Sequence, residues 1–338
     1  MKGRSPTLRS MPRALITTVP FGDKNRLPIE RLEAARIEYV INPIGRKLKE
    51  EELVEMVSDF DVLIAGTEPI TRKVIEKGKN LKLISRVGIG LDGVDLIAAR
   101  EAGIEVSYTP DAPAPAVAEL TIGLMLSLLR GVNITNLRLH KGEWQRTFGR
   151  RIPEVTLGII GAGRVGGRVL RRLAAFGSPR VLVNDISHSD KNIAPELKLE
   201  WVDKEIIYRE ADLISLHLPL TPMTKNLIKK EQLELMKPDA LLVNTSRGGI
   251  INEADLATKL REEKIGGAAI DVFEEEPYHG ELAQLDNCLL TAHLGSMSVD
   301  CRTRMEIEAT EDAVRFFSGE PLKRPVPEEE YEVQRSSL

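Results

Sequence analysis

The feature that most constrains the fold of this chain is a glycine pattern between a short apolar run and a helix. The run Thr156 to Ile160 has no polar face, which is typical of a strand buried in a parallel sheet. It leads directly into residues 161–166, GAGRVG, and the apolar residues from Val169 to Phe176 then have helical spacing. Strand, glycine turn and helix in this order predict a βαβ unit whose helix N-terminus can receive a phosphate.

Each glycine of this turn has its own physical purpose. Gly161 permits the tight turn, Gly163 lets backbone N–H groups approach a pyrophosphate, and Gly166 lets the helix pack closely on the strand. A second apolar run ends at Asp185, 19 residues past Gly166, where a carboxylate can bind the adenosine ribose hydroxyls. The pattern predicts a dinucleotide site and favours NAD over NADP. The alternative is an ordinary βαβ turn with an aspartate at a strand end.

Apolar runs alternate with helical stretches along most of the 338 residues, a length that predicts two domains. The alternation predicts an α/β fold of two doubly wound parallel-sheet domains, one flavodoxin-like and one Rossmann. We place a hinge at the proline-rich stretch 109–115 and expect the apolar helix Ala116–Leu129 to be buried between the two domains. The predicted strands are Ala14–Ile16, Glu38–Ile41, Val62–Ile64, Leu81–Val87 and Ile104–Val106, then Thr156–Ile160, Val181–Asn184, Leu213–Leu218, Ala240–Asn244, Ala268–Ile270 and Leu289–Ala292.

Composition narrows the classes of partner. The net charge of −4 gives no reason to expect nucleic acid or an anionic membrane, and no apolar run is long enough to span a bilayer. Two cysteines and five histidines lack metal-ligand spacing, so we expect no metal and a reducing, cytoplasmic location. We expect a loose leader of about a dozen residues, with Met1 or Met11 as the start, and an extended or disordered tail beyond Pro321.

Three candidate catalytic residues follow predicted strands downstream of the glycine turn. Arg247 follows ALLVNTS, Glu276 lies five residues past Asp271, and His293 ends LLTAH. An arginine fork binds a carboxylate, and a histidine exchanges protons near neutral pH, where an adjacent carboxylate favours its charged form. Ligands of open α/β sheets bind beyond the strands' carboxyl ends, so the set suits reduction of a 2-oxo acid. Singly, each residue also fits a plain structural role.

Five motifs in order carry a resemblance to a known family. The chain resembles the D-isomer-specific 2-hydroxyacid dehydrogenases, and most closely the branch that contains 3-phosphoglycerate dehydrogenase. The resemblance implies that the C-terminal helix crosses back, so that residues 1–108 and 299–338 form the substrate-binding domain and residues 109–298 the NAD-binding Rossmann domain. The motifs are GAGRVG (161–166), LHLPLTPMTKNLI (216–228), LLVNTSRGGIINEADL (241–256), IDVFEEEP (270–277) and LLTAHLGSMS (289–298).

The resemblance also implies roles for single residues. Arg247 would bind the substrate carboxylate and carbonyl, His293 would be the general acid or base, and Glu276 its partner. Val87, Gly88 and Ile89 would face the substrate. NAD would be held by Gly161, Gly163, Arg164, Val165, Gly166, Asp185, His217, Pro219, Thr245, Ser246, Asp271 and Gly295, with Asp271 on the nicotinamide carboxamide.

The expected function is therefore NAD-dependent interconversion of a D-2-hydroxy acid and its 2-oxo acid, by a homodimer on family analogy. A phosphoglycerate-like substrate is one candidate, although Glu68 stands where an arginine would suit a phosphate, and Ala292 replaces the usual proline before the histidine. Two alternatives stay open. One is an NAD(H)-sensing binding protein or corepressor on the same fold. The other is an NADP-linked glyoxylate or hydroxypyruvate reductase, which Asp185 disfavours.

Overall fold

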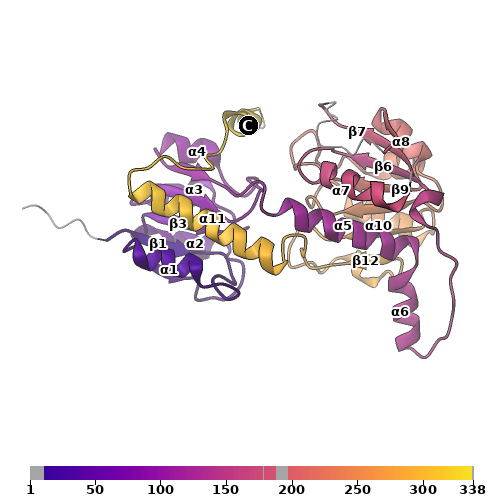
Figure 1. Ribbon diagram of the computed structural model, residues 1–338, viewed down its shortest axis with the longest axis horizontal. Helices are drawn as coiled ribbons and strands as arrows, with labels where there is room; N and C mark the ends of the chain where they lie inside the picture. The colour runs from indigo at the N-terminus through magenta and orange to yellow at the C-terminus, as the bar shows by residue number, and fades with distance from the viewer. Residues whose placement is uncertain (1–10, 178, 188–196, 337–338) are drawn as a thin grey trace, which may run out of the picture. The chain divides into compact units, whose positions relative to one another are not determined.

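A computed structural model describes residues 11–177, 179–187 and 197–336, so most of the expected leader lies outside the described residues (Figure 1). The chain divides into two compact units. Unit 1 is Met1–Pro113 with Val299–Leu338, and unit 2 is Ala114–Ser298. Unit 1 extends beyond the expected limit at 108, because the Tyr108 amide still donates to the Arg324 carbonyl and the Thr109 amide to the Gly88 carbonyl.

Unit 1 is a five-stranded parallel sheet in the order β2-β1-β3-β4-β5, the strand order of flavodoxin-like folds. Every residue of β3 and β4 is buried, whereas β2 at the edge is half exposed. The long helix α11 packs on β3, β4 and α1, so the C-terminal segment completes this unit. The elements are β1 (Arg13–Ile16), α1 (Leu27–Ala34), β2 (Glu38–Ile41), α2 (Glu50–Met56), β3 (Val62–Ala65), α3 (Arg72–Lys77), β4 (Leu83–Arg86), α4 (Leu96–Glu101), β5 (Glu105–Ser107), α11 (Val299–Phe317) and α12 (Glu328–Arg335).

Residues 322–336 of the tail are ordered, so the expectation of an extended or disordered tail is wrong for them. This segment contains α12, which packs on α4. The Tyr331 ring is buried beneath the Arg100 guanidinium, whose carbon lies 3.5 Å from the ring centroid, and Arg100 also pairs with Glu328 at 2.7 Å. Gln334 adds two hydrogen bonds, since its Oε1 accepts the Leu96 amide at 2.8 Å and its Nε2 donates to the Val94 carbonyl at 2.6 Å. An apolar anchor, an ion pair and these hydrogen bonds therefore hold a helix whose composition is mostly charged.

Unit 2 is a seven-stranded parallel sheet in the order β12-β11-β10-β9-β6-β7-β8. The sequence predicts six of these strands and misses β8, a three-residue edge strand next to β7 that is only partly buried. The strand order reverses at β6, which is where open α/β sheets bind ligands. The elements are α5 (Ala114–Leu129), α6 (Val132–His140), β6 (Thr156–Ile160), α7 (Gly166–Leu173), β7 (Arg180–Asn184), β8 (Leu199–Trp201), α8 (Lys204–Glu210), β9 (Leu213–Leu216), α9 (Lys230–Leu235), β10 (Leu241–Asn244), α10 (Glu253–Arg261), β11 (Gly267–Ile270) and β12 (Cys288–Leu290).

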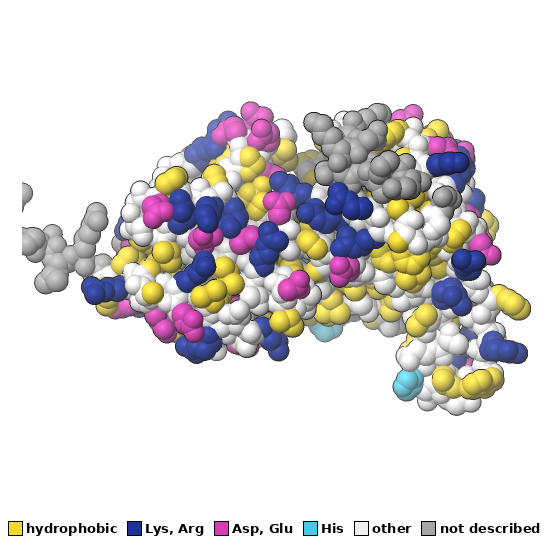
Figure 2. Space-filling model, viewed as in Figure 1, with side chains coloured by type: hydrophobic (Ala, Val, Ile, Leu, Met, Phe, Trp, Pro, Cys, Tyr) yellow, Lys and Arg dark blue, Asp and Glu magenta, His cyan; other side chains and the backbone are white. Residues whose placement is uncertain are grey.

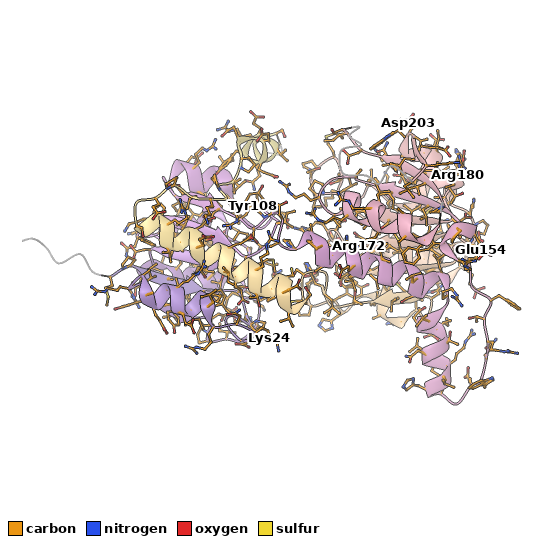
Figure 3. The ribbon with its side chains drawn as sticks, in the orientation of Figure 1. Lys24, Tyr108, Glu154, Arg172, Arg180 and Asp203 are labelled. Atoms are coloured by element: carbon orange, nitrogen blue, oxygen red, sulfur yellow. The ribbon has the colours of Figure 1, made fainter. Side chains whose placement is uncertain are left out.

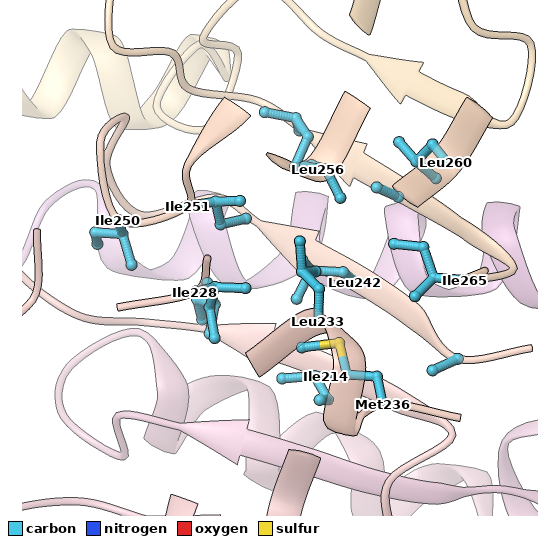
Figure 4. Close-up of a cluster of buried hydrophobic side chains, with 14 of the residues drawn as sticks. Ile214, Ile228, Leu233, Met236, Leu242, Ile250, Ile251, Leu256, Leu260 and Ile265 are labelled. Carbon is cyan, nitrogen blue, oxygen red and sulfur yellow. The ribbon is translucent and has the colours of Figure 1, made fainter. Parts of the chain in front are cut away.

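Two hydrophobic clusters make up the core of unit 2. One gathers side chains such as Ile214, Leu242 and Leu256 (Figure 4). The other lies beneath α5 and α7 and includes Met125, Leu157 and Val169. The two helices pack against each other, and Arg172 of α7, marked in Figure 3, pairs with Glu119 of α5 at 2.8 Å. The apolar faces of α5 are thus buried within unit 2, against α7, β10 and β11.

Two further properties of the described residues concern membrane-spanning helices and metal sites. None of the helices there has by itself the length and apolar character needed to cross a membrane, although the bent pair α5 and α6 passes by length and composition. The same part of the chain has no group of three or more His, Cys, Asp or Glu side chains that could hold a metal ion.

Candidate active site

In the glycine turn after β6, backbone conformation and packing require some of the glycines but not others. Gly161 has a φ of +95°, in the region that favours glycine. A Cβ on Gly166 would overlap the carbonyl oxygen of Gly161, so the close packing of α7 needs a glycine there. A Cβ on Gly163 would meet no atom of the described chain within 4 Å. The packing of the protein therefore does not require Gly163, and the open space above it fits a phosphate at the helix N-terminus.

Asp185 follows β7 and lies against this turn. Its Oδ2 accepts the Ala162 amide at 2.6 Å and its Oδ1 accepts the Ser187 amide at 2.9 Å. The carboxylate is therefore fixed beside the glycine turn. Its hydrogen bonds to ribose hydroxyls stay a prediction. Of the other residues predicted for the cofactor here, Arg164 and Pro219 are exposed and Val165 is half-buried.

His217 follows β9 and packs on the other side of the turn, where a Cβ on Gly161 would overlap its carbonyl oxygen. Its Nε2 lies 3.0 Å from Ser215 Oγ, whereas its Nδ1 is shielded from solvent and has no hydrogen-bond partner among the described atoms. Burial lowers the pKa of His217 to about 3. The imidazole is therefore neutral at physiological pH and serves here as a packing group rather than as a charge.

The loop after β10 carries Arg247 and is held by a residue that the sequence motifs did not single out. Asn244 Oδ1 accepts the Ser246 amide at 3.0 Å and the Ser246 hydroxyl at 2.7 Å, and its Nδ2 donates to the Arg247 carbonyl at 2.9 Å. The Thr245 hydroxyl lies 2.8 Å from that of Thr121 on α5. A buried asparagine at the end of a strand is the signal that could have identified this support.

His293 and Glu276 are in direct contact. The Nδ1 of His293 lies 2.9 Å from Oε2 and 3.1 Å from Oε1 of Glu276. Glu276 Oε1 also accepts the Phe273 amide at 3.1 Å, which fixes the carboxylate. With Nδ1 directed at the carboxylate, the ring presents Nε2 as its other proton-exchanging atom, and the His293 side chain is 36% exposed.

Asp271 supports the loop that carries this histidine. Its Oδ1 accepts the Thr291 hydroxyl at 2.6 Å and the Leu294 amide at 2.7 Å, and its Oδ2 accepts the Gly295 amide at 2.9 Å. Its carbonyl accepts the His293 amide at 2.9 Å. The buried carboxylate thus organises the turn around His293, a role that the sequence did not predict. Its predicted bond to a nicotinamide carboxamide stays a prediction.

The catalytic candidates of unit 2 therefore gather at one edge. Arg247, Asp271 and His293 follow β10, β11 and β12, which are neighbours in the sheet. A Cβ on Gly248 would overlap the Phe273 carbonyl, so the loops of Arg247 and Glu276 are packed against each other. The edge supplies an arginine for an anion and a histidine–carboxylate pair for proton transfer.

The three residues predicted to face the substrate lie at the carboxyl edge of the sheet of unit 1, after β4. Val87 is buried, and its amide donates to the Ala65 carbonyl at the end of β3. Gly88 has a φ of +143°, and its amide donates to the Thr109 hydroxyl at 2.8 Å. Ile89 is partly exposed. Two charged residues are buried at the same edge: Glu68, which the sequence analysis set against a phosphate, and Arg86, to which it gave no role.

The fold and this site define a class of protein, and comparison with known proteins names it. Residues 122–295 match the model of the D-isomer specific 2-hydroxyacid dehydrogenase NAD binding domain. The chain belongs to this family, as the sequence motifs predicted, and unit 2 contains its NAD-binding domain. The prediction of NAD as cofactor is confirmed at the level of the family.

The names of individual relatives agree with this family. The chain is 42% identical to D-3-phosphoglycerate dehydrogenase of Methanocaldococcus jannaschii over 82% of its own length and 53% of that protein. It is 39% identical to hydroxypyruvate reductase of Thermotoga maritima over 78% of its own length and 87% of that protein. The crystal structure of the TT0316 protein from Thermus thermophilus matches with a TM-score of 0.84 and 33% identity, over 93% of this chain and 100% of that one. The chain thus spans about half the length of the first relative and most of the second.

Proposed function

We propose that this chain is an NAD-dependent dehydrogenase that interconverts a D-2-hydroxy acid and its 2-oxo acid. The observation that carries the proposal is the pair of His293 Nδ1 and Glu276 Oε2 at 2.9 Å, beside the loop of Arg247 at the carboxyl edge of an NAD-binding domain. A histidine held in this way exchanges a proton, and an arginine beside it binds the carboxylate of an acid.

The mechanism assigns one task to each residue. The Arg247 guanidinium binds the substrate carboxylate as a fixed fork and so orients the adjacent carbonyl. In reduction, His293 gives the proton on Nε2 to the carbonyl oxygen, and in oxidation it takes the proton from the hydroxyl. Glu276 fixes the tautomer by accepting Nδ1–H and stabilises the imidazolium that carries the proton. When bound, NAD would accept a hydride in the oxidation and NADH would donate one in the reduction.

Hydride transfer is tested by NADH oxidation at 340 nm against a panel of 2-oxo acids, with glyoxylate, pyruvate, hydroxypyruvate and phosphohydroxypyruvate among them. We expect turnover of at least one acid, weaker turnover with NADPH, and a loss of about 100-fold or more in kcat for His293→Ala. His279→Ala, which changes an exposed histidine of the same unit, is the matched control. Tight NADH binding without reduction of any acid would contradict the proposal and favour a nucleotide-sensing protein.

We also propose that the chain acts as a homodimer in the cytoplasm. The segment from α6 to residue 148 projects from the body of unit 2 and carries exposed apolar side chains (Figures 1 and 2). Trp144 is 83% exposed and Phe148 fully exposed. The same unit has a cavity of about 470 Å³ whose lining includes Leu126, Arg130 and Phe176. Apolar walls with guanidinium groups suit an aromatic ring of a second copy. Cys288 and Cys301 are buried and form no disulfide, which fits a reducing compartment.

A further inference from the structure

We propose that Glu253, the first residue of α10, is a positioning residue for the proposed reaction, because it ties the loop of Arg247 to the loop of Glu276. It thereby holds the carboxylate that supports His293. The inference rests on the proposed function and adds one residue to its machinery. All of these residues belong to unit 2, and the family resemblance gave no role to Glu253.

The loop that carries Arg247 continues directly into α10. Ile251, in the connecting segment, is buried in the core of unit 2 (Figure 4). Asn252 caps the helix, since its Oδ1 accepts the Asp255 amide at 3.0 Å. The side chain of Glu253 therefore starts from a fixed backbone.

Glu253 reaches from this backbone to the loop after β11. Its Oε1 accepts the Glu274 amide at 2.7 Å. One residue earlier in that loop, the Phe273 amide donates to Glu276 Oε1 at 3.1 Å. Two carboxylates thus bind consecutive amides of one turn, and such charge-assisted hydrogen bonds are stronger than neutral ones. Loss of the Glu253 oxygen removes one support of the turn that directs the Glu276 carboxylate.

Backbone packing joins the same two loops at the same peptide group. A Cβ on Gly248 would overlap the Phe273 carbonyl and would come within 2.5 Å of the Glu274 nitrogen. The residue after Arg247 therefore touches the peptide whose N–H binds Glu253. The segment from the arginine to α10 contacts this peptide twice, so the placement of one loop depends on the placement of the other.

A glutamate in the first turn of a helix also has a plain structural use, because it complements the helix dipole. The position of the Glu253 carboxylate goes beyond that use. Burial raises the pKa of Glu253, and the charges of Glu274 and Glu276 raise it further, whereas the bond to the Glu274 amide lowers it. A fully exposed glutamate at the helix start would avoid this unfavourable environment, and the bond to the amide offsets it in part.

Three substitutions of Glu253 separate this role from an effect on the helix. Glu253→Gln keeps the reach and an oxygen that accepts the Glu274 amide, so kcat with the preferred acid should stay within about threefold of wild type. Glu253→Ala removes the acceptor, and Glu253→Asp keeps the charge but is one carbon shorter. Both should lower kcat about 10-fold with KM changed less than about threefold, because Glu276 is displaced while substrate binding is retained. Glu262→Ala, at the exposed far end of α10, should leave kcat unchanged.

A double-mutant cycle shows whether Glu253 acts through Glu276. In a Glu276→Ala chain, Glu253→Ala should change kcat less than about twofold, since the carboxylate that it positions is already gone. An equal loss of kcat in both backgrounds overturns the proposal, because it marks a general structural effect. Retained kcat in Glu253→Asp with a loss in Glu253→Gln also overturns it, because the charge at the helix N-terminus would then decide the effect.

Hydrogen exchange of the Glu274 amide gives a readout that does not depend on activity. This amide should exchange about 10-fold faster or more in Glu253→Ala than in the wild-type and Glu253→Gln chains. Exchange at the wild-type rate in Glu253→Ala overturns the proposal, as does an unchanged kcat in that variant, and both results leave the dehydrogenase function standing. A wild-type chain that reduces no acid of the panel rejects the proposed function, and with it the role of Glu253 in the reaction.

Discussion

At the scale of single residues, the site depends on a histidine held in an uncommon backbone conformation. His293 has a φ of +52°, in the left-handed region that non-glycine residues seldom adopt. Asp271 holds the turn by accepting the amides of Leu294 and Gly295 as well as the Thr291 hydroxyl. Glu276 then fixes the ring from the other side. A buried carboxylate that satisfies several donors is an effective way to hold one side chain in a strained turn.

Replacement of Glu276 should separate its support of His293, which affects kcat, from substrate binding, which affects KM. Glu276→Gln retains the shape but loses the charge that stabilises an imidazolium, so we expect kcat to fall about 10- to 100-fold with KM changed less than threefold. Steady-state kinetics with the preferred acid measures both constants. Glu275→Gln alters an exposed neighbour in the same acidic run and should leave kcat unchanged. An unchanged kcat in Glu276→Gln would contradict the role given to this pair.

His217 should make the stability of unit 2 depend on pH. Its pKa is about 3 in the folded chain, against 6.5 for an unperturbed histidine, so the unfolded chain binds an extra proton between these values. The contribution of the neutral ring is complete above pH 6.5 and is lost as the pH falls toward 3, by up to about 1.4 kcal/mol per pH unit. The difference in unfolding free energy between pH 7 and pH 5 should therefore shrink in His217→Gln.

Tryptophan fluorescence during urea unfolding measures this effect specifically, because both tryptophans, Trp144 and Trp201, lie in unit 2. His279→Gln, at an exposed position of the same unit, should keep the wild-type pH dependence. An identical dependence in His217→Gln and the wild-type chain would show that His217 is not buried as a neutral ring.

At the scale of elements, the glycine turn between β6 and α7 combines two different requirements. Gly161 and Gly166 are required by the chain itself, since one has a positive φ and the other touches the backbone of the turn. Gly163 faces open space in the described chain. One motif therefore contains positions that determine folding and a position that is left for a ligand.

Two alanine substitutions should separate these requirements. Gly166→Ala forces a methyl group onto the Gly161 carbonyl, so we expect a loss of unfolding free energy of about 2 kcal/mol or more. Gly163→Ala should leave stability within about 0.5 kcal/mol but raise the Kd for NADH about 10-fold or more, because the methyl group occupies the space of the phosphate. Urea unfolding and fluorescence titration with NADH measure the two effects. Unchanged NADH affinity in Gly163→Ala would place the phosphate elsewhere.

At the scale of the whole molecule, the segment from α6 to residue 148 stands out because its exposed apolar side chains are not covered by the described part of unit 2. Such a surface on a chain of net charge −4 promotes association with a matching surface. A symmetric dimer provides one, because each copy offers both an aromatic segment and a cavity.

The dimer can be tested at this surface. Trp144→Ser combined with Phe148→Ser removes two aromatic side chains that are exposed in the single chain, so we expect the sedimentation coefficient to fall from that of a dimer to that of a monomer of 37.5 kDa. Folding should be retained, since neither side chain is in the core. Met223→Ser, at another exposed position of unit 2, should leave the dimer intact. A wild-type chain that sediments as a monomer would reject the assembly.

The sequence by itself determined the family, the parallel α/β architecture and the residues of the glycine turn. These are local properties, because apolar runs, glycine spacing and strand-end polar residues lie within short windows of sequence. The short edge strand β8 and the helix α12 could not be predicted in this way. Their residues have weak periodicity, and α12 is held by Tyr331 and Arg100, which are distant in sequence.

Only the tertiary structure decided how the candidate residues are supported. Asn244 holds the Arg247 loop, Asp271 holds the turn of His293, and Glu68 folds back onto Thr17 and Gly66. The contacts of Asp271 and the contact between Glu68 and Thr17 join the ends of strands that are neighbours in the sheet but far apart in the chain, so strand order brings these atoms together. The contacts of Asn244 and of Glu68 with Gly66 are local, and only the conformation of each loop decides them. Hydrogen bonding and burial depend on those distances, and a sequence read in windows does not contain them.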